Sequence, residues 1–384
     1  MDVSYNRDLK AGIYIHVPFC VKKCRYCSFY SIEEKRFDDY ISALEKSIGK
    51  SAAGFLSADS VYFGGGTPSL LPPDYILRIL EKLKSKFEIS NDCEITLELN
   101  PGTVSKDYFR KILKTGVNRL NMGVQSLDND NLRLLGRIHS AKKAQESCHE
   151  ARDAGFSNIG LDFIYGLPSQ SRENLLRDLE SFIMLRPEHI SAYMLTLEKN
   201  TKFYSMCERK EIEMLQEEVC ADFFLTVLKF LGEGGYKFYE ISNFALSERY
   251  FSRHNQKYWD FSPYIGFGPS AHSFLNGKRW SEPASFDLWY SNIINNENKG
   301  FFEEETDTDQ QKTEFVFLGL RTEKGIDILR YEALFGEDFF SRFESVIKKF
   351  SSEELLVVSE GFLSLTEKGF LFSDYISLRF AEKI

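Results

Sequence analysis

The chain has 384 residues, 43% of them hydrophobic and 27% charged, which is typical of a globular protein with two or three domains. Its formal net charge of −9 argues against an extended nucleic-acid surface, because such a surface needs a surplus of Lys and Arg. No stretch has the length and hydropathy of a membrane span, and the first residues, MDVSYNRDLK, lack the apolar core of a secretory signal. We therefore expect a cytoplasmic protein without a transmembrane segment.

Short β-rich runs alternate with helical patterns over the first half of the chain. The strand-like runs are GIYIHV at 12–17, SVYFGG at 60–65, EITLELN at 94–100, RLNMGVQ at 119–125, NIGLDFIYG at 158–166 and HISAYMLT at 189–196. The helical patterns between them cover 37–48, 74–87, 106–116, 141–155 and 172–186. Six strands, each followed by a helix, predict right-handed βαβ units and a parallel sheet, either open or closed into a full or partial barrel.

The remainder of the chain does not continue the regular alternation of strands and helices. A seventh β-like run, YKFYEISNFA at 236–245, leads into a region that reads as a loop, FSRHNQKYWDFSPYIGFGPSAHSF at 251–274. Beyond residue 300 we expect a helix near 307–319, further helices within 327–350, and two short apolar runs, LLVV and FLSL, separated by SEG. This order resembles a winged-helix-like module. From Phe301 onward there are 18 Asp and Glu against 10 Lys and Arg, so this module is acidic.

Three of the seven cysteines, Cys20, Cys24 and Cys27, lie within eight positions. A structural zinc ion needs four ligands, and no second cysteine pair follows, although His16 is a possible fourth ligand. A [4Fe–4S] cluster fits better, because three thiolates hold three irons and leave the fourth open to a substrate or cofactor. The C-x3-C-x2-C spacing, with Tyr26 before the last cysteine, resembles the signature of the radical S-adenosylmethionine (SAM) proteins.

Polar residues follow the same strands toward their carboxyl ends. The run GGGTPS at 64–69 closes the second strand, and three glycines let backbone amides approach a ligand closely. Strand alternation places Glu98 with Asn100, Gln125 with Asn121, and Asp162 by itself on a polar face. We expect these residues to share one site with the cysteine loop, because polar residues at the carboxyl ends of barrel strands form sites. A buried network, with Arg137 as the partner of the carboxylates, is the alternative.

The motifs YIHVPFC, VYFGGGTPSLL, LELNPGT, RLNMGVQSL, GLDFIYGLP and YEISNFA resemble the oxygen-independent coproporphyrinogen III oxidase family over almost the whole chain. The resemblance implies a radical SAM partial (β/α)6 TIM-type barrel in residues 1–285 and a smaller C-terminal helical or winged module in 286–384. It also implies that Cys20, Cys24 and Cys27 bind the cluster. The residues that it assigns to SAM are Tyr14, Tyr26, Gly65, Gly66, Thr67, Glu98, Gln125, Arg137 and Asp162.

Three departures favour the heme-chaperone branch of this family over the oxidase proper. Phe29 replaces a further cysteine of the oxidase, and only eleven residues precede the first strand, where the oxidase has an extension around its substrate. The run HNQKYW at 254–259 matches a motif associated with heme in the chaperones, which implies that His254 is a heme ligand beside Tyr258 and Trp259. The alternative for this motif is a structural loop, and His16 and His272 are rival ligands.

The expected function is therefore to bind heme or a porphyrin and pass it to an acceptor apoprotein, with a membrane hemoprotein among the candidates. The cofactors implied are a [4Fe–4S] cluster, SAM and heme. The alternative is an enzyme, a radical SAM oxidase that decarboxylates coproporphyrinogen III in porphyrin biosynthesis. A DNA-binding role for the C-terminal module is disfavoured by its acidity.

Overall fold

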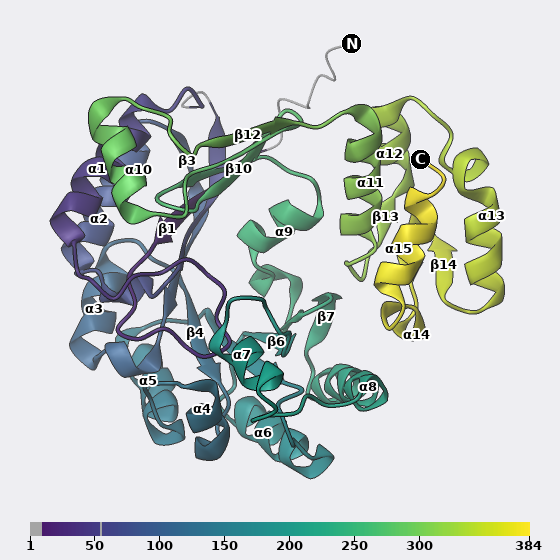
Figure 1. The fold of residues 1–384 in the computed structure, drawn as a ribbon, viewed down its shortest axis with the longest axis horizontal. Helices are drawn as coiled ribbons and strands as arrows, with labels where there is room; N and C mark the ends of the chain where they lie inside the picture. Colours follow the sequence, from purple (N-terminus) through teal and green to yellow (C-terminus); the bar gives the residue numbers. More distant parts are fainter. Residues whose placement is uncertain (1–9, 54–55) are drawn as a thin grey trace.

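The computed structural model describes residues 10–53 and 56–384, so most of the N-terminal stretch discussed above lies outside the described residues. Its centre is the parallel sheet that the alternating pattern predicts (Figure 1). The six parallel strands are β1 (Ala11–Val17), β2 (Ser57–Gly65), β3 (Glu88–Leu99), β4 (Arg119–Gln125), β5 (Ile159–Tyr165) and β6 (His189–Met194). They are neighbours in chain order. The prediction of a partial (β/α)6 barrel is confirmed.

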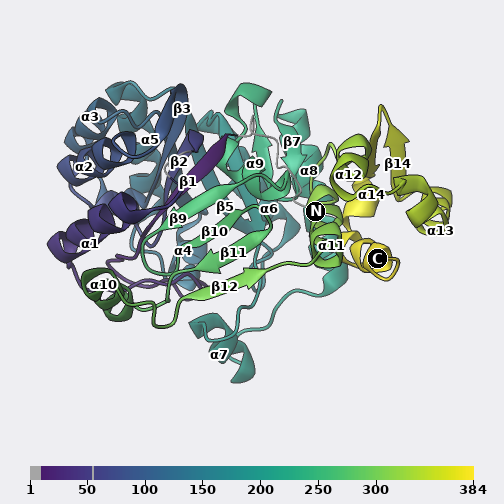
Figure 2. The ribbon, with the colours of Figure 1, turned by 90° about the horizontal axis from the view of Figure 1, so that it is seen from above.

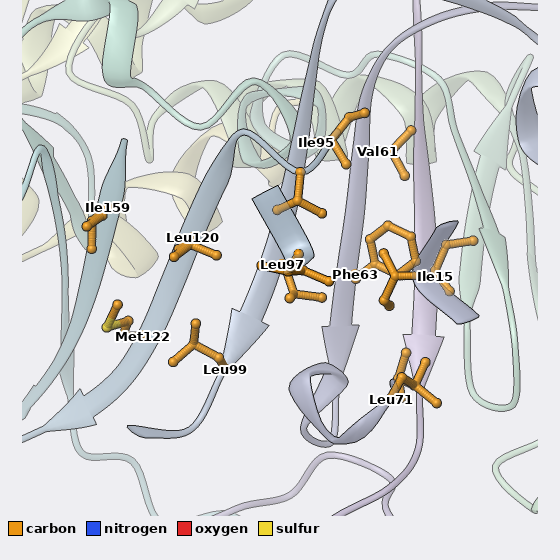
Figure 3. Close-up of a cluster of buried hydrophobic side chains, with 14 of the residues drawn as sticks. Ile15, Val61, Phe63, Leu71, Ile95, Leu97, Leu99, Leu120, Met122 and Ile159 are labelled. Carbon is orange, nitrogen blue, oxygen red and sulfur yellow. The ribbon is translucent and has the colours of Figure 1, made fainter. Parts of the chain in front are cut away.

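Helices cover the outer face of this sheet, on the left and lower side of Figure 1. They are α1 (Phe37–Lys50), α2 (Pro73–Lys84), α3 (Lys106–Lys114), α4 (Asn129–Leu135), α5 (Ala141–Ala154) and α6 (Arg172–Met184). Apolar side chains of the strands, among them Ile15, Phe63, Leu97 and Met122, are fully buried beneath the helices (Figure 3). Burial of each such side chain contributes about 1.5–3 kcal/mol. The hydrophobic core therefore lies between the outer face of the sheet and the helices. The inner face of the sheet is left for polar residues.

The sheet continues beyond the six predicted strands at both edges. Strands β7 (Lys237–Glu240) and β8 (Asn243–Ala245) form a hairpin that joins β6. On the other side, β9 (Tyr264–Phe267) runs parallel to β1, and β10 (His272–Leu275), β11 (Lys278–Ser281) and β12 (Phe302–Glu305) follow in antiparallel order, as Figure 2 shows. The result is one sheet of twelve strands.

The region expected to be a loop, residues 251–274, is mostly regular structure. It contains the helix α9 (Arg253–Trp259) and the strands β9 and β10. Ser252 caps α9, because its hydroxyl accepts a hydrogen bond from the amide of Asn255. Helix α9 has only seven residues, too few to show a clear apolar period, and β9 reads as a loop because Gly266 and Gly268 flank Phe267.

The packing places the domain boundary later than residue 285. Helix α10 (Phe286–Asn295) contributes Phe286 and Trp289 to the core of the barrel, and β12 pairs with β11. Residues 286–305, which the sequence assigned to the C-terminal module, thus pack with the barrel. The aromatic spacing of FDLWY predicts a helix, but it does not indicate to which domain that helix belongs.

The C-terminal module has the element order of a winged helix. Helix α11 (Thr308–Gly319) precedes β13 (Ile326–Asp327), α12 (Ile328–Phe335) and α13 (Phe339–Ser352). The two predicted apolar runs form the hairpin β14 (Leu356–Ser359) and β15 (Phe362–Leu365), and β13 pairs with β15. The short α14 (Glu367–Phe370) and α15 (Ser373–Ala381) complete it. Helices α7 (Lys202–Glu208) and α8 (Glu217–Glu233) belong to the barrel side.

The module is joined to the barrel by a shared core and by backbone hydrogen bonds. Phe261 and Phe274 of the barrel lie in the same apolar cluster as Phe315 of α11. The amide of Ile241 donates to the carbonyl of Arg321 at 2.9 Å, and further bonds flank it. The two parts therefore form one continuous body. Among the described residues, no helix is long and apolar enough to cross a membrane.

Candidate functional site

The cysteine loop leaves the carboxyl end of β1 and is held by its own backbone. The amide of Cys20 donates to the carbonyl of Ile32 at 2.8 Å, and the amide of Thr67 donates to the carbonyl of Phe19 at 2.7 Å. The second bond ties the loop to the residues that follow β2. The ends of two parallel strands thus fix the loop at one edge of the sheet, as the sequence predicts.

Cys20, Cys24 and Cys27 are half-buried and line a cavity of about 360 Å³ at this edge. Burial raises the pKa of Cys27, and the nearby Cys24 and Cys20 add to this effect. The guanidinium of Arg137 donates to Sγ of Cys24 at 3.3 Å and so orients this side chain. Three thiol groups around one cavity fit a cluster that takes three protein ligands and keeps one iron open.

A zinc site built from these cysteines and His16 does not fit the geometry. The Nδ1 atom of His16 lies 3.2 Å from the hydroxyl of Tyr14, and its Nε2 atom lies 3.0 Å from the carbonyl oxygen of Tyr30. Both ring nitrogens are thus engaged away from the thiols. The side chain is also buried, which lowers its pKa to about 4 and keeps it neutral.

The glycine run closes one wall of the cavity. A Cβ atom on Gly66 would lie 2.7 Å from the carbonyl oxygen of Phe19, so only glycine lets these segments meet. Gly65 has φ +103°, a value that side chains disfavour. Gly65, Gly66 and Thr67 all line the cavity with their backbones near the cysteines, as predicted.

Two partly buried carboxylates, Glu98 and Asp162, line the same cavity from β3 and β5. Glu98 accepts a hydrogen bond from the hydroxyl of Tyr62 at 2.7 Å, and Asp162 accepts one from the amide of Asn121 at 2.9 Å. Burial raises the pKa of Glu98 to about 7 and that of Asp162 to about 6. Neither carboxylate forms an ion pair with a described residue, so the cavity suits a cationic ligand.

This donor set fits SAM, which carries an ammonium and a sulfonium group. The two carboxylates would pair with positive charge, and the glycine backbone would face the amino acid part. The polar residues are therefore not a self-satisfied network in which Arg137 neutralises the acids. Arg137 instead reaches Cys24, the hydroxyl of Tyr26 at 3.4 Å and the carbonyl of Gly123.

Tyr26, Gln125 and Arg137 also line the cavity. Gln125 has φ +71°, an unusual backbone conformation that ends β4 and turns its side chain across Gly123. A Cβ atom on Gly123 would lie 2.9 Å from Nε2 of Gln125. The structure thus brings together all three predicted cysteines and eight of the nine residues assigned to SAM.

Tyr14 is the exception, and it lies deeper in the barrel. Its ring stacks on Tyr62 and His254, with centroid distances of 6.2 and 6.0 Å. Burial raises its pKa well above the usual value. Tyr14 therefore links the floor of the barrel to His16 but does not line the cavity.

His254 lies on α9 below these tyrosines and is 1% exposed. Its Nδ1 atom is 3.2 Å from the hydroxyl of Ser60, and its Nε2 atom is 3.0 Å from the hydroxyl of Tyr258. Burial lowers its pKa to about 3. The motif HNQKYW thus closes the inner space of the barrel at the end opposite the cysteines. The heme-ligand role of His254 stays a prediction, and both of its ring nitrogens are already engaged.

Trp259, the last residue of the motif, faces a different space. It lines a cavity of about 1360 Å³ between the barrel and the C-terminal module, together with Phe315 and Arg330. Its Nε1 atom is buried without a hydrogen-bond partner among the described residues. His254 and Trp259 therefore do not converge on one ligand.

Several cavity residues were not singled out from the sequence. Tyr193 at the end of β6 and Thr196 and Glu198 in the loop after it line the cysteine cavity. Strand alternation in HISAYM was the available signal, because it places Ser191 and Tyr193 on one face. Phe29, which the sequence analysis did single out, also lines the cavity and is 66% exposed.

Comparisons with known proteins agree with this geometry. Residues 14–182 match the Radical SAM superfamily, and residues 307–372 match the HemN C-terminal domain. The heme chaperone HemW of Bacillus subtilis is 33% identical over 371 residues, which cover 94% of this chain and 97% of that protein. The heme chaperone HemW of Escherichia coli is 38% identical over 266 residues, 68% of this chain and 69% of that protein.

A solved structure shares the fold. The coproporphyrinogen III oxidase HemN of Escherichia coli, described as a radical SAM enzyme, superimposes with a TM-score of 0.83 at 23% identity. The match covers 100% of this chain and 92% of that one. At this identity the likeness establishes the architecture of barrel and C-terminal module, not the activity.

Proposed function

Because the chain belongs to the HemW family of radical SAM proteins, we propose that it is a heme chaperone, which binds heme and transfers it to acceptor apoproteins. The main support for this proposal is the length over which the chain aligns with a heme chaperone. The Bacillus subtilis heme chaperone aligns over 97% of its own length, including the C-terminal module. The oxidase HemN, at 23% identity, supports the fold alone.

We assign the cysteine loop to a [4Fe–4S] cluster and the adjoining cavity to SAM. Cys20, Cys24 and Cys27 would hold three irons, and Glu98 and Asp162 would pair with the charges of SAM. When bound, the reduced cluster would supply an electron to SAM. The protein's own part is to hold the two carboxylates in place, through the hydroxyl of Tyr62 for Glu98 and the amide of Asn121 for Asp162.

Phe29 supports the chaperone over the oxidase. It stands where the oxidase has a further cysteine, and here it exposes 66% of its surface at the edge of the cavity. A phenyl ring offers an apolar contact but neither a metal ligand nor a proton donor. Heme as the cargo, an acceptor apoprotein as the partner and a cytoplasmic location are parts of the proposal.

Anaerobic incubation of the reconstituted protein with coproporphyrinogen III, a reductant and SAM tests the proposal. We expect no vinyl product, while ferric heme added separately is retained through gel filtration and then passes to an excess of apomyoglobin. If the protein converts coproporphyrinogen III to the vinyl product over multiple turnovers, its function is that of the oxidase and not of the chaperone. Failure to retain heme would reject the proposal outright. The triple variant with Cys20, Cys24 and Cys27 changed to Ala controls for cluster-dependent steps.

A further inference from the structure

The surface around the cysteine loop is basic, although the chain as a whole is acidic. Residues 20–30 and 199–210 hold seven Lys and Arg against a single Glu, whereas the net charge of the whole chain is −9. The first segment is the cysteine loop, and the second contains helix α7. Where these two segments meet, their charges produce a positive field at the surface, because the fields of neighbouring like charges add.

Backbone contacts place the two segments side by side. The amide of Phe203 in α7 donates to the carbonyl of Arg25 at 2.9 Å, and the amide of Arg25 donates to the carbonyl of Leu135 at 3.1 Å. Thr201 caps α7, because its hydroxyl accepts a hydrogen bond from the amide of Tyr204. Helix α7 therefore lies against the cysteine loop, and Figure 2 shows that it projects from the barrel.

A hollow of about 560 Å³ lies between the cysteine loop and α7. Its described lining includes the basic residues Arg25, Lys202 and Arg209 and one acidic residue, Glu211. Glu211 is paired with Arg209 at 2.6 Å. Arg25 and Lys202 form no ion pair with any residue that the structure describes. Two cationic side chains of the hollow therefore remain available to an external anionic group.

The mouth of the cysteine cavity adds two further cations and exposed apolar side chains. Lys22 and Lys23 line this cavity, and within the described part of the chain neither forms an ion pair. Val21 and Phe29, on the same loop, are 48% and 66% exposed. Glu198, in the loop after β6, is the acidic residue that faces them. Apolar side chains beside unpaired charges are typical of a surface that contacts another protein transiently.

The position of this surface indicates the kind of partner. It surrounds Cys20, Cys24 and Cys27, to which we assign the cluster. Each electron that a reduced cluster gives to SAM must be replaced from outside the chain. Complementary charge speeds the encounter of two proteins, and weak contacts between electron-transfer proteins bury less than about 1,200 Å². A small basic surface beside the cluster therefore fits a transient electron donor whose own surface is acidic.

We propose that Lys22, Lys23, Arg25 and Lys202 form the docking surface of an acidic one-electron carrier protein that reduces the cluster. In this step one electron leaves the carrier and enters the cluster, whose net charge becomes more negative by one. No bond forms or breaks, and no proton is transferred. The inference rests on the proposed [4Fe–4S] cluster but not on heme as the cargo.

Calorimetry of the reconstituted full-length protein with plant-type [2Fe–2S] ferredoxin, an acidic carrier, tests the docking surface. We expect saturable binding at low ionic strength that weakens about tenfold or more when the salt concentration rises from about 0.05 M to about 0.5 M. Lys202→Glu should weaken binding about tenfold. This change places an acid in the first turn of α7, where the helix dipole favours it, so the helix should persist. Lys22→Glu should have a similar effect.

Lys142→Glu is the matched control, because it makes the same change of charge on the outer helix α5, where the Lys142 side chain is 85% exposed. It should bind ferredoxin as the wild type does. A second measurement follows cluster reduction by electron paramagnetic resonance. Reduced ferredoxin should reduce the cluster of Lys202→Glu about tenfold more slowly than that of the wild type. Dithionite, a small reductant that needs no docking surface, should reduce both proteins to the same extent.

Equal weakening in Lys202→Glu and Lys142→Glu would overturn the proposal, since only the net charge would then matter. Wild-type affinity in both Lys202→Glu and Lys22→Glu would also overturn it. If the protein instead forms dimers that Lys202→Glu dissociates, and ferredoxin does not bind, the basic surface contacts the acidic C-terminal module of a second copy. If dithionite produces no reduced-cluster signal in the wild type, the proposed cluster itself is rejected, and this result is seen before any variant is compared.

Discussion

At Gly66 the cysteine loop approaches the end of β2 so closely that no room is left for a methyl group. A Cβ atom there would lie 2.7 Å and 2.9 Å from the carbonyl oxygens of Phe19 and Val17, which are backbone atoms that cannot rotate away. We expect Gly66→Ala to lower the free energy of unfolding by about 1–3 kcal/mol and to reduce the iron content after reconstitution. Chemical denaturation and iron analysis measure the two effects.

Gly232→Ala is the matched control for this change. Gly232 lies within α8, and a Cβ atom there meets nothing within 4 Å. The same substitution should stabilise the protein by about 0.5–1 kcal/mol. Similar destabilisation by both variants would show that the close approach at Gly66 is not what requires glycine.

Glu98 makes the stability of the SAM-free protein depend on pH. Burial raises its pKa from 4.5 to about 7, so the folded state binds a proton that the unfolded state releases between these values. Stability should therefore fall as the pH rises through this window, and by pH 8 the cost is roughly 3 kcal/mol. Glu98→Gln keeps the hydrogen bond from Tyr62 and removes this cost. Melting curves from pH 4 to 8 measure the difference.

Binding of SAM should show the opposite dependence. The carboxylate that destabilises the empty site is the group that pairs with the ammonium of SAM, so wild-type affinity should rise from pH 6 to pH 8. Glu98→Gln should bind SAM more weakly at pH 8, with little pH dependence from this position. If calorimetry finds the same affinity in both proteins, Glu98 is only a structural acid.

Helix α9 is held beneath the barrel by a partly buried ion pair. The Nζ atom of Lys257 lies 2.8 Å from Oδ1 of Asp59 and 2.9 Å from the carbonyl oxygen of Lys10. The Lys257 side chain is 9% exposed. Lys257→Ala leaves the carboxylate of Asp59 without its partner, so we expect a loss of about 1–3 kcal/mol in unfolding free energy.

A double-mutant cycle separates the pair from the lost packing. Asp59→Asn together with Lys257→Ala should cost less than the sum of the two single changes, because no uncompensated charge remains. Strict additivity would mean that the ion pair does not anchor the helix.

The sequence predicts some elements well and others poorly, for physical reasons. The βαβ units were predictable because each strand is an apolar run and each helix has a clear 3.6-residue period. Helix α9 and strands β9 to β12 were not, because they are short and their hydrogen bonds depend on partners far along the chain. The cavity residues Glu98 and Asp162 were predictable from strand alternation. Tyr14, on the same kind of strand, lies too far from the carboxyl end.

On the scale of the whole molecule, the barrel and the C-terminal module share one core. Phe315 of α11 contacts Phe261 of the barrel and Tyr331 of its own module, with ring centroids 6.1 and 5.9 Å apart. Phe315→Ala should cost about 3–5 kcal/mol and lower the melting temperature of the barrel together with that of the module. Far-UV circular dichroism and cluster absorbance, recorded in one melt, test this coupling.

Phe340→Ala provides the control, because Phe340 is 44% exposed on α13 of the same module. It should change the melting temperature little. Two separate transitions in the Phe315→Ala protein, with the barrel unaffected, would show that the parts unfold independently despite their common core.

The pairing of β1 with β9 has a consequence for biosynthesis. The cysteine loop emerges from the ribosome directly after β1, yet β1 gains its second neighbour only when residues 264–267 are made. At typical rates of translation this interval is on the order of tens of seconds. During this interval the three thiols lie on a nascent chain in which β1 lacks its partner β9. We therefore expect cluster insertion to follow the synthesis of β9, and oxidation of the thiols during translation to compete with it.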